Sequence, residues 1–213
     1  MTREQLEHIV RAAGSIADEQ KILVLGSQSI LGSFPYPPDT LTVSREADVC
    51  PMRDPSKADL ISGAIGEVSQ FDSTFGYYAH GLPPEACPLP TGWETRLVSF
   101  RNPNTRGVTA LCLAPLDLAG SKLVAGRDKD KEFVTEMLRH NLIAEPALTE
   151  RIALFEQAEQ RRLAVRTLEI VRTRLAAGAK EAERQSAARL RPDSHITPVA
   201  RPRPSPRGPG MGM

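Results

Sequence analysis

The chain has 213 residues and is poor in aromatic residues, in cysteine and in long apolar runs. Its three cysteines, Cys50, Cys87 and Cys112, are odd in number and lack paired spacing, so they predict reduced thiols with a structural role. No segment approaches the roughly 18 apolar residues that a membrane-spanning helix needs, and the N-terminus lacks the apolar core of a signal peptide. We therefore expect a cytoplasmic protein without a membrane partner.

Several motifs that carry well-known chemistry are also missing. The chain has no P-loop, no G-x-G-x-x-G fingerprint, no C-x-x-C pair and no G-x-S-x-G nucleophile elbow. Its four histidines, His8, His80, His140 and His195, are scattered without the spacing of metal ligands, which argues against a zinc site. None of the corresponding enzyme classes has support from a motif.

Charge is distributed unevenly along the chain, although the net charge is only +1. Residues 151–213 hold 12 Arg and one Lys against six acidic residues, whereas residues 1–150 hold 14 basic and 20 acidic residues. A basic segment of this kind can contact nucleic acid or the acidic face of a partner. Interspersed Glu and Arg also make an ordinary solvated helix surface, and the lack of interleaved aromatic residues weakens the RNA-binding interpretation.

Apolar periodicity predicts an α/β (α+β) fold, a mixed sheet flanked by helices. Thr2 and Gln5 fit a capping box for a helix over residues 3–13 that ends at Gly14. Strands are expected near residues 21–25, 41–52, 75–81, 95–100 and 107–113. Further helices are expected near residues 28–32, 56–71, 116–126, 130–140 and 148–190.

These elements divide the chain into three predicted parts. Residues 1–147 form the α/β domain, and residues 148–190 form a C-terminal helical extension. The extension carries an apolar stripe that can pack on the domain or on a second chain, made of Leu148, Ile152, Phe155, Leu163, Leu168, Val171 and Leu175. Residues 191–213 are rich in Pro and Arg without an apolar period, so we expect a disordered tail there.

The first chemical feature is a Gly-Ser pair where a buried strand turns into a helix. In "ILVLGSQSILG", Gly26 and Ser27 direct backbone N–H groups and a hydroxyl toward one place, which favours an anion such as a phosphate. Gly-Ser at the end of a strand is also a common plain turn.

The second feature is an acid-x-acid pair in "SREADVCP". On an extended strand Glu46 and Asp48 point to the same face, where their charges repel one another. A divalent cation removes that repulsion, and Mg²⁺ is usually held by one or two carboxylates together with substrate phosphates. The alternative is that both acids lie on the exposed face of an edge strand.

The third feature is a cluster of charged residues in "LAGSKLVAGRDKDKEF". Lys122 can reach a triphosphate as a point charge, with Arg127 beside it and with Asp130 holding or orienting the lysine. The alternative interpretation is a charged helix surface with no ligand.

The order of these motifs resembles the nucleotidyltransferase superfold shared with DNA polymerase beta. The stretch "LAPLDLAGSKLVAGRDKDKEFV" is similar to an arrangement in AbiE-type toxin nucleotidyltransferases. A closer resemblance is to an uncharacterised bacterial group of nucleotidyltransferase-like proteins, through "GSQSILG", "EADV" and "LPTGWETR". The resemblance covers roughly residues 1–152 and makes that part a nucleotidyltransferase-like domain.

The resemblance implies transfer of a nucleoside monophosphate from an NTP, with Mg²⁺ or Mn²⁺ as cofactor. It implies that Gly26, Ser27, Lys122, Arg127 and Asp130 bind the nucleotide, that Glu46 and Asp48 ligate metal, and that Glu46, Asp48, Glu94 and Lys122 are catalytic. Glu94 stands for the family's third carboxylate because "TRLVSF" contains no acid, and Asp72 is the second choice. The acceptor is RNA or protein, and a role as the toxin of a toxin–antitoxin pair implies an antitoxin partner.

Two other functions remain open at this point. The first is a catalytically inactive nucleotide-binding or protein-interaction module that keeps the fold, which follows if no third carboxylate reaches the metals. The second is an RNA-binding adaptor that uses the basic C-terminal helix, whose binding would fall steeply with salt.

Overall fold

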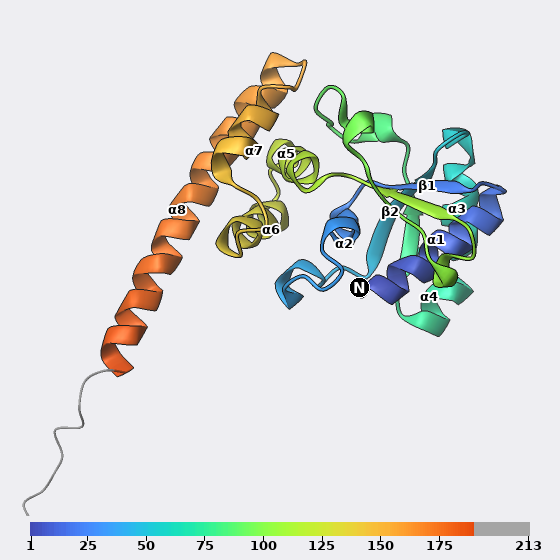
Figure 1. The fold of residues 1–213 in the computed structure, drawn as a ribbon, viewed down its shortest axis with the longest axis horizontal. Coiled ribbons are helices and arrows are strands. Elements are labelled where there is room, and N and C mark those ends of the chain that lie inside the picture. The colour runs from blue at the N-terminus through green and yellow to red at the C-terminus, as the bar shows by residue number, and fades with distance from the viewer. Residues whose placement is uncertain (190–213) are drawn as a thin grey trace, which may run out of the picture. The chain divides into compact units, whose positions relative to one another are not determined.

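The computed structural model describes residues 1–189, and a five-stranded mixed sheet is its central feature (Figure 1). The strands are β1 (Lys21–Val24), β2 (Glu46–Pro51), β3 (Tyr78–Gly81), β4 (Val98–Phe100) and β5 (Thr109–Cys112). They lie in the order β3-β2-β1-β5-β4. The pairs β1–β5 and β2–β3 are parallel, whereas β1–β2 and β4–β5 are antiparallel. The predicted mixed α/β fold class is confirmed.

The antiparallel pairing of β1 with β2 places the residues that follow β1 beside the first half of β2. In β1, the branched apolar residues Ile22, Leu23 and Val24 are consecutive and all buried, as is typical of a strand covered on both faces. β2 runs antiparallel to β1 and ends at Pro51, which has no N–H for a further ladder bond. Because Val24 pairs with Val49, the residues that follow β1 lie beside the start of β2.

Helices surround this sheet. They are α1 (Arg3–Ala17), α2 (Ile30–Ser33), α3 (Ala58–Ile65), α4 (Gln70–Phe75), α5 (Pro115–Ala125), α6 (Asp128–Arg139), α7 (Glu145–Ile152) and α8 (Ala158–Arg189). Figure 1 shows α1 and α3 together beside the sheet, while α5 and α6 lie next to α7. One hydrophobic core joins the sheet to residues of α5, α6, α7 and α8.

The predicted apolar stripe of the C-terminal helices is largely buried. Two helices, α7 and α8, replace the single stretch expected from residue 148 to residue 190. Leu148, Ile152, Phe155, Leu168 and Val171 are buried as predicted, and Leu175 packs partly buried against the core. Leu163 is 40% exposed, because Ala164 takes the core position that continues the spacing to Leu168 and Val171.

The first helix is longer than its sequence indicates. Its N-terminus has the predicted capping box between Thr2 and Gln5, but the helix continues through Gly14 to Ala17. Inside the helix, Gly14 packs closely against Val108. A Cβ at this position would lie 2.6 Å from Val108 Cγ2, so only glycine permits this close packing. The left-handed residue that ends the helix is Asp18, with φ 54°.

The helix expected over residues 56–71 is split into α3 and α4. Gly66 is extended at the end of α3, and Ser69 then caps α4 by accepting a hydrogen bond from the Asp72 N–H. The sequence signals for this break are Gly66 followed by a Ser N-cap, which outweigh the continuous apolar spacing.

The described residues divide into a compact unit, Met1–Ala177, and a second part that begins at Gly178. The domain boundaries after residues 147 and 190 stay predictions. The tail expected at residues 191–213 lies outside the described residues. Among residues 1–189, no helix has the length and apolar character needed to cross a membrane.

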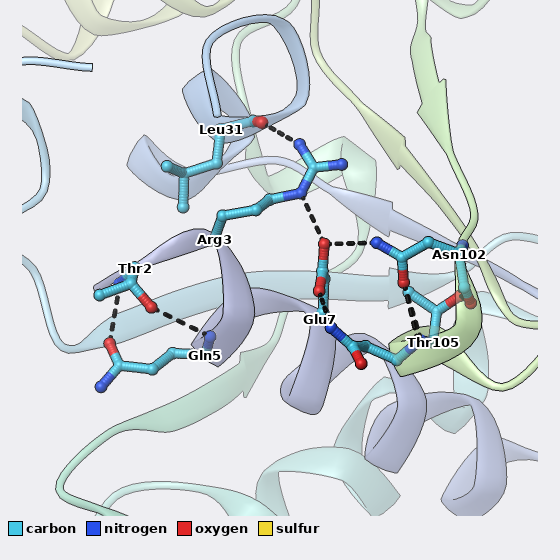
Figure 2. A network of polar contacts seen from close by, with 8 residues as sticks. Thr2, Arg3, Gln5, Glu7, Leu31, Asn102 and Thr105 are labelled. Atoms are coloured by element: carbon cyan, nitrogen blue, oxygen red, sulfur yellow. Dashed lines mark hydrogen bonds and ion pairs between the residues drawn. The ribbon is translucent and has the colours of Figure 1, made fainter. Parts of the chain in front are cut away.

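A buried carboxylate ties α1 to the turn before β5 (Figure 2). Glu7 accepts hydrogen bonds from Asn102 Nδ2 at 2.6 Å, from Asn104 Nδ2 at 2.9 Å and from Arg3 Nε at 3.0 Å. Arg3 also donates to the Leu31 carbonyl in α2. Burial acts to raise the pKa of Glu7, but these hydrogen bonds and the Arg3 charge outweigh it, so the pKa is lowered.

We predict that Glu7→Gln costs about 2 kcal/mol of unfolding free energy at pH 7 and much less at pH 3. The folded pKa of Glu7 lies below its ordinary value of 4.5, so ionised Glu7 stabilises the fold above that pH. This stabilisation is lost as the pH falls through the folded pKa. Urea unfolding at both pH values measures the difference, with exposed Glu4→Gln on the same helix as the matched control. Equal losses for the two variants would contradict it.

Candidate active site

The turn after β1 is held against β2. The Leu25 N–H donates to the Asp48 carbonyl at 2.9 Å, and Gly26 then begins a 3-10 turn, η1 (Ser27–Ser29). A Cβ built on Gly26 would lie 1.8 Å from Asp48 Oδ2, so the carboxylate occupies the space that any other residue at position 26 would fill. Gly26 is therefore required for the approach of Asp48 to the turn.

The acidic pair lies on the face of β2 that does not enter the core. Ala47 and Val49 are fully buried, whereas Glu46 and Asp48 are half-buried and alternate with them. Burial, and next the charge of Glu46, raises the pKa of Asp48, with His80 acting in the opposite direction. The ionised pair is thus unfavourable without a positive partner.

The neighbouring strand β3 adds two polar side chains to the same face. In the parallel register Glu46 pairs with Tyr78, and Asp48 pairs with His80. The Tyr78 hydroxyl donates to Glu46 Oε2 at 2.9 Å, and His80 Nδ1 lies 3.3 Å from Asp48 Oδ1. One potential ligand atom from each of Glu46, Asp48 and His80 lies within 4.8 Å of the other two.

Positive side chains come from α5 and from the start of α6. Lys122 Nζ donates to Asp130 Oδ1 at 3.1 Å, and Arg127 Nε donates to Asp130 Oδ2 at 2.6 Å. Asp130 is fully buried and Lys122 is only 8% exposed, whereas the Arg127 side chain is 62% exposed. Burial lowers the pKa of Lys122, although Asp130 opposes the change. Asp130 thus holds two cations in place.

A single cavity of about 460 Å³ brings both groups together. Its lining includes Gly26 and Ser27 from the turn, together with the acidic pair and His80. It also includes the cationic residues Lys122, Arg127 and Lys129. A second cavity of about 520 Å³ shares Ser27, Ser44, Lys122 and Lys129 with the first and extends toward Phe133. The arrangement can accommodate a polyanion between cations and a metal-binding acidic pair.

The two candidates for a third carboxylate lie elsewhere. Glu94 is in the 3-10 turn η5 (Trp93–Arg96) and lines a different cavity with Trp93 and Glu156. Asp72 lies in the first turn of α4, where it forms an ion pair with Arg45 and accepts a hydrogen bond from the Val68 N–H. Among the described residues, the three-membered ligand group contains neither acid.

Sequence motifs did not single out His80 and Lys129, which line this cavity, or Tyr78, which donates a hydrogen bond to Glu46. Tyr78 and His80 alternate in "YYAHG", so their common face is visible in the sequence, but their pairing with β2 is not. Lys129 was part of the charged run "GRDKDKE" and carried no distinguishing signal.

The donor set fits a divalent cation. Glu46 and Asp48 supply suitable oxygen ligands, and the cavity that they share with Gly26 and Ser27 leaves space for a phosphate to complete the shell. The hydrogen bond that the Tyr78 hydroxyl donates to Glu46 orients this carboxylate, as hydrogen bonds commonly orient metal ligands.

Comparison with known proteins gives one match. A family described as "Nucleotidyltransferase of unknown function (DUF6036)" matches residues 4–175. No curated protein and no solved structure matches the chain. The match extends over the turn after β1, the acidic pair on β2 and the cations of α5 and α6. On this basis the chain belongs to the nucleotidyltransferase family of unknown function DUF6036.

Proposed function

We propose that the protein transfers a nucleoside monophosphate from an NTP to a hydroxyl of RNA or protein, with a divalent cation at Glu46 and Asp48. The observation that carries this proposal is the shared cavity in which the acidic pair faces Lys122 and Arg127. Family membership supplies the reaction class.

Each group has a distinct role in this reaction. Gly26 and Ser27 receive the triphosphate at the turn, and Lys122 and Arg127 neutralise its charge from the other side. Glu46 and Asp48 hold the cation, which when bound would orient the phosphates and stabilise the charge that develops on them. The acceptor hydroxyl gives its proton to water as its oxygen attacks the α-phosphorus, the bond from the α-phosphorus to the bridging oxygen of the β-phosphate breaks, and pyrophosphate leaves.

Two alternatives keep specific support. An inactive nucleotide-binding module gains support from the position of Glu94, which lines another cavity and leaves the acidic pair without a third carboxylate. An RNA-binding adaptor has less support, because Arg172 and Arg174 of α8 form ion pairs with Glu145, Glu169 and Asp128. A toxin role with an antitoxin partner is proposed only through the resemblance of the sequence.

Incubation of the purified chain with NTPs labelled at the α-phosphate, Mg²⁺ or Mn²⁺, and total cellular RNA and protein tests the proposal. We expect acid-precipitable label in one acceptor fraction, none after chelation with EDTA, and none from γ-labelled NTP. The γ-label distinguishes nucleotidyl transfer from phosphoryl transfer. NTP binding without α-label transfer under any metal condition would favour the inactive module.

A further inference from the structure

We propose that His80 is a ligand of the divalent cation and that it makes the site prefer a transition-metal ion such as Mn²⁺ over Mg²⁺. The inference deepens the proposed function, since it rests on the same cation at Glu46 and Asp48. It assigns a role to a residue on β3 that sequence motifs do not reveal. The third member of the ligand group is an imidazole, whereas the sequence predicted a carboxylate.

The strand register brings the imidazole to the acidic pair. β2 and β3 are parallel, and Asp48 and His80 are direct Cα partners. Side chains at directly paired positions of adjacent strands lie on the same face of the sheet. His80 therefore extends from the sheet beside Asp48, and its side chain is 50% exposed. His80 needs no rearrangement of the backbone to bind the same ion as Asp48.

The distances suit a common ion. Neighbouring ligand atoms of an octahedral ion bound at about 2.1 Å lie roughly 3 Å apart. The 3.3 Å separation of His80 Nδ1 and Asp48 Oδ1 is close to that value. The ligand atom of Glu46 lies within 4.8 Å of those of Asp48 and His80, so only a small movement of side chains brings all three to one ion.

Tyr78 leaves one oxygen of Glu46 available. Its hydroxyl donates to Oε2, so the second carboxylate oxygen can face the ion. A donor fixed in this way orients the ligand without competing for the cation.

Ligand chemistry gives the selectivity. Mg²⁺ prefers oxygen ligands and water, whereas imidazole nitrogen suits transition metals, for which affinity rises from Mn²⁺ along the first row. A set of two carboxylates and one histidine therefore favours a transition-metal ion more than two carboxylates alone would. Cys87 lines the same cavity but contributes no ready thiolate, because burial raises the pKa of this thiol to about 11.

Binding of the metal alone to the full-length chain tests this inference. Mn²⁺ affinity is measured by electron paramagnetic resonance of the free ion, and Mg²⁺ affinity by its competition with Mn²⁺. We expect His80→Ala to weaken Mn²⁺ binding about tenfold or more and Mg²⁺ binding less than about threefold. His80→Asp, which gives an all-oxygen site, should lower the ratio of Mn²⁺ to Mg²⁺ affinity by a similar factor.

Spectroscopy on bound Mn²⁺ provides a second readout. Electron spin echo modulation from a coordinated imidazole nitrogen should be present in the wild type and absent from His80→Asp. His140→Ala is the matched control, because His140 also lies near a carboxylate, Glu136, at 3.4 Å on another element. It should keep both the nitrogen signal and the affinities.

The outcomes separate this inference from the proposed function. If His80→Ala leaves Mn²⁺ binding unchanged, or weakens both ions equally, the inference is wrong. If α-label transfer still depends on Asp48 in that case, the proposed function stands. If Mn²⁺ binds with the nitrogen signal but no NTP is used, the inference stands and the proposed function is wrong.

Discussion

Asp48→Asn is expected to reduce nucleotidyl transfer about a thousandfold or more, because a metal ligand supplies several kcal/mol of transition-state stabilisation. The amide keeps the shape of the side chain but removes the negative charge that the cation and the triphosphate require. Asp48 is the central member of the site, since it contacts His80 and approaches Gly26. Incorporation of α-label into the acceptor, measured over the linear phase, gives the rate ratio.

The stability of this variant makes the result interpretable. The pKa of Asp48 is raised in the fold, so the ionised carboxylate destabilises the metal-free protein above its folded pKa, and this effect disappears at low pH. Asp48→Asn should therefore melt at the same temperature as the wild type or higher at pH 7 in EDTA. Metal should raise the melting temperature of the wild type only. Retention of more than about a tenth of the rate would contradict a ligand role.

Asp130→Ala is expected to cost about 3–5 kcal/mol of unfolding free energy, the usual loss when one partner of a buried ion pair is removed. Asp130 is fully buried and accepts from both Lys122 and Arg127. Without it, the Lys122 ammonium remains in a buried position, next to the ring of Phe133 at 4.5 Å, and loses the carboxylate to which it is hydrogen-bonded. Urea unfolding at pH 7 measures the loss.

A double variant tests the physical cause. Lys122→Met with Asp130→Leu replaces the pair by apolar side chains of similar size, which should recover most of the lost stability. The double variant should nevertheless be inactive in α-label transfer, because the cation at the triphosphate is gone. Asp128→Ala is the matched control, since Asp128 lies in the same turn of α6 with an 82% exposed side chain and should leave the unfolding free energy close to that of the wild type. If the loss of unfolding free energy in the double variant equals the sum of the losses in the two single variants, Lys122 and Asp130 do not interact as a pair.

Much of the fold could be predicted because its signals are local. The capping box of Thr2 and Gln5, the apolar run of β1 and the proline that ends β2 each act within a few residues. The errors arise where distant contacts decide. Gly14 reads as a helix end, but it continues the helix because Val108, far along the chain, packs against its bare Cα. The error at Leu163 is of another kind, because Ala164 rather than Leu163 has the spacing that continues to the buried Leu168 and Val171.

The candidate site also has a part that local signals predict and a part that depends on distant contacts. Glu46 and Asp48 share a face through their own spacing, and the structure brings them to Gly26 and to Lys122 in one cavity. Their roles in catalysis stay predictions. His80 could not be assigned to this group, because nothing local states that β3 runs parallel to β2 with His80 opposite Asp48. Spacing along the chain reveals pairs within a strand but not partners across a sheet.

The alignment of β3 on β2 carries a consequence for how this protein tolerates insertions and deletions. On one face the paired strands place Ala47 and Val49 beside Ala79 and Gly81, and all four are buried. Displacing β3 by a single residue would turn His80 into that interior and push Ala79 out to the solvent. Length changes between the two strands must therefore be absorbed in the connecting helices, and a protein that folds at all retains the imidazole next to the acids.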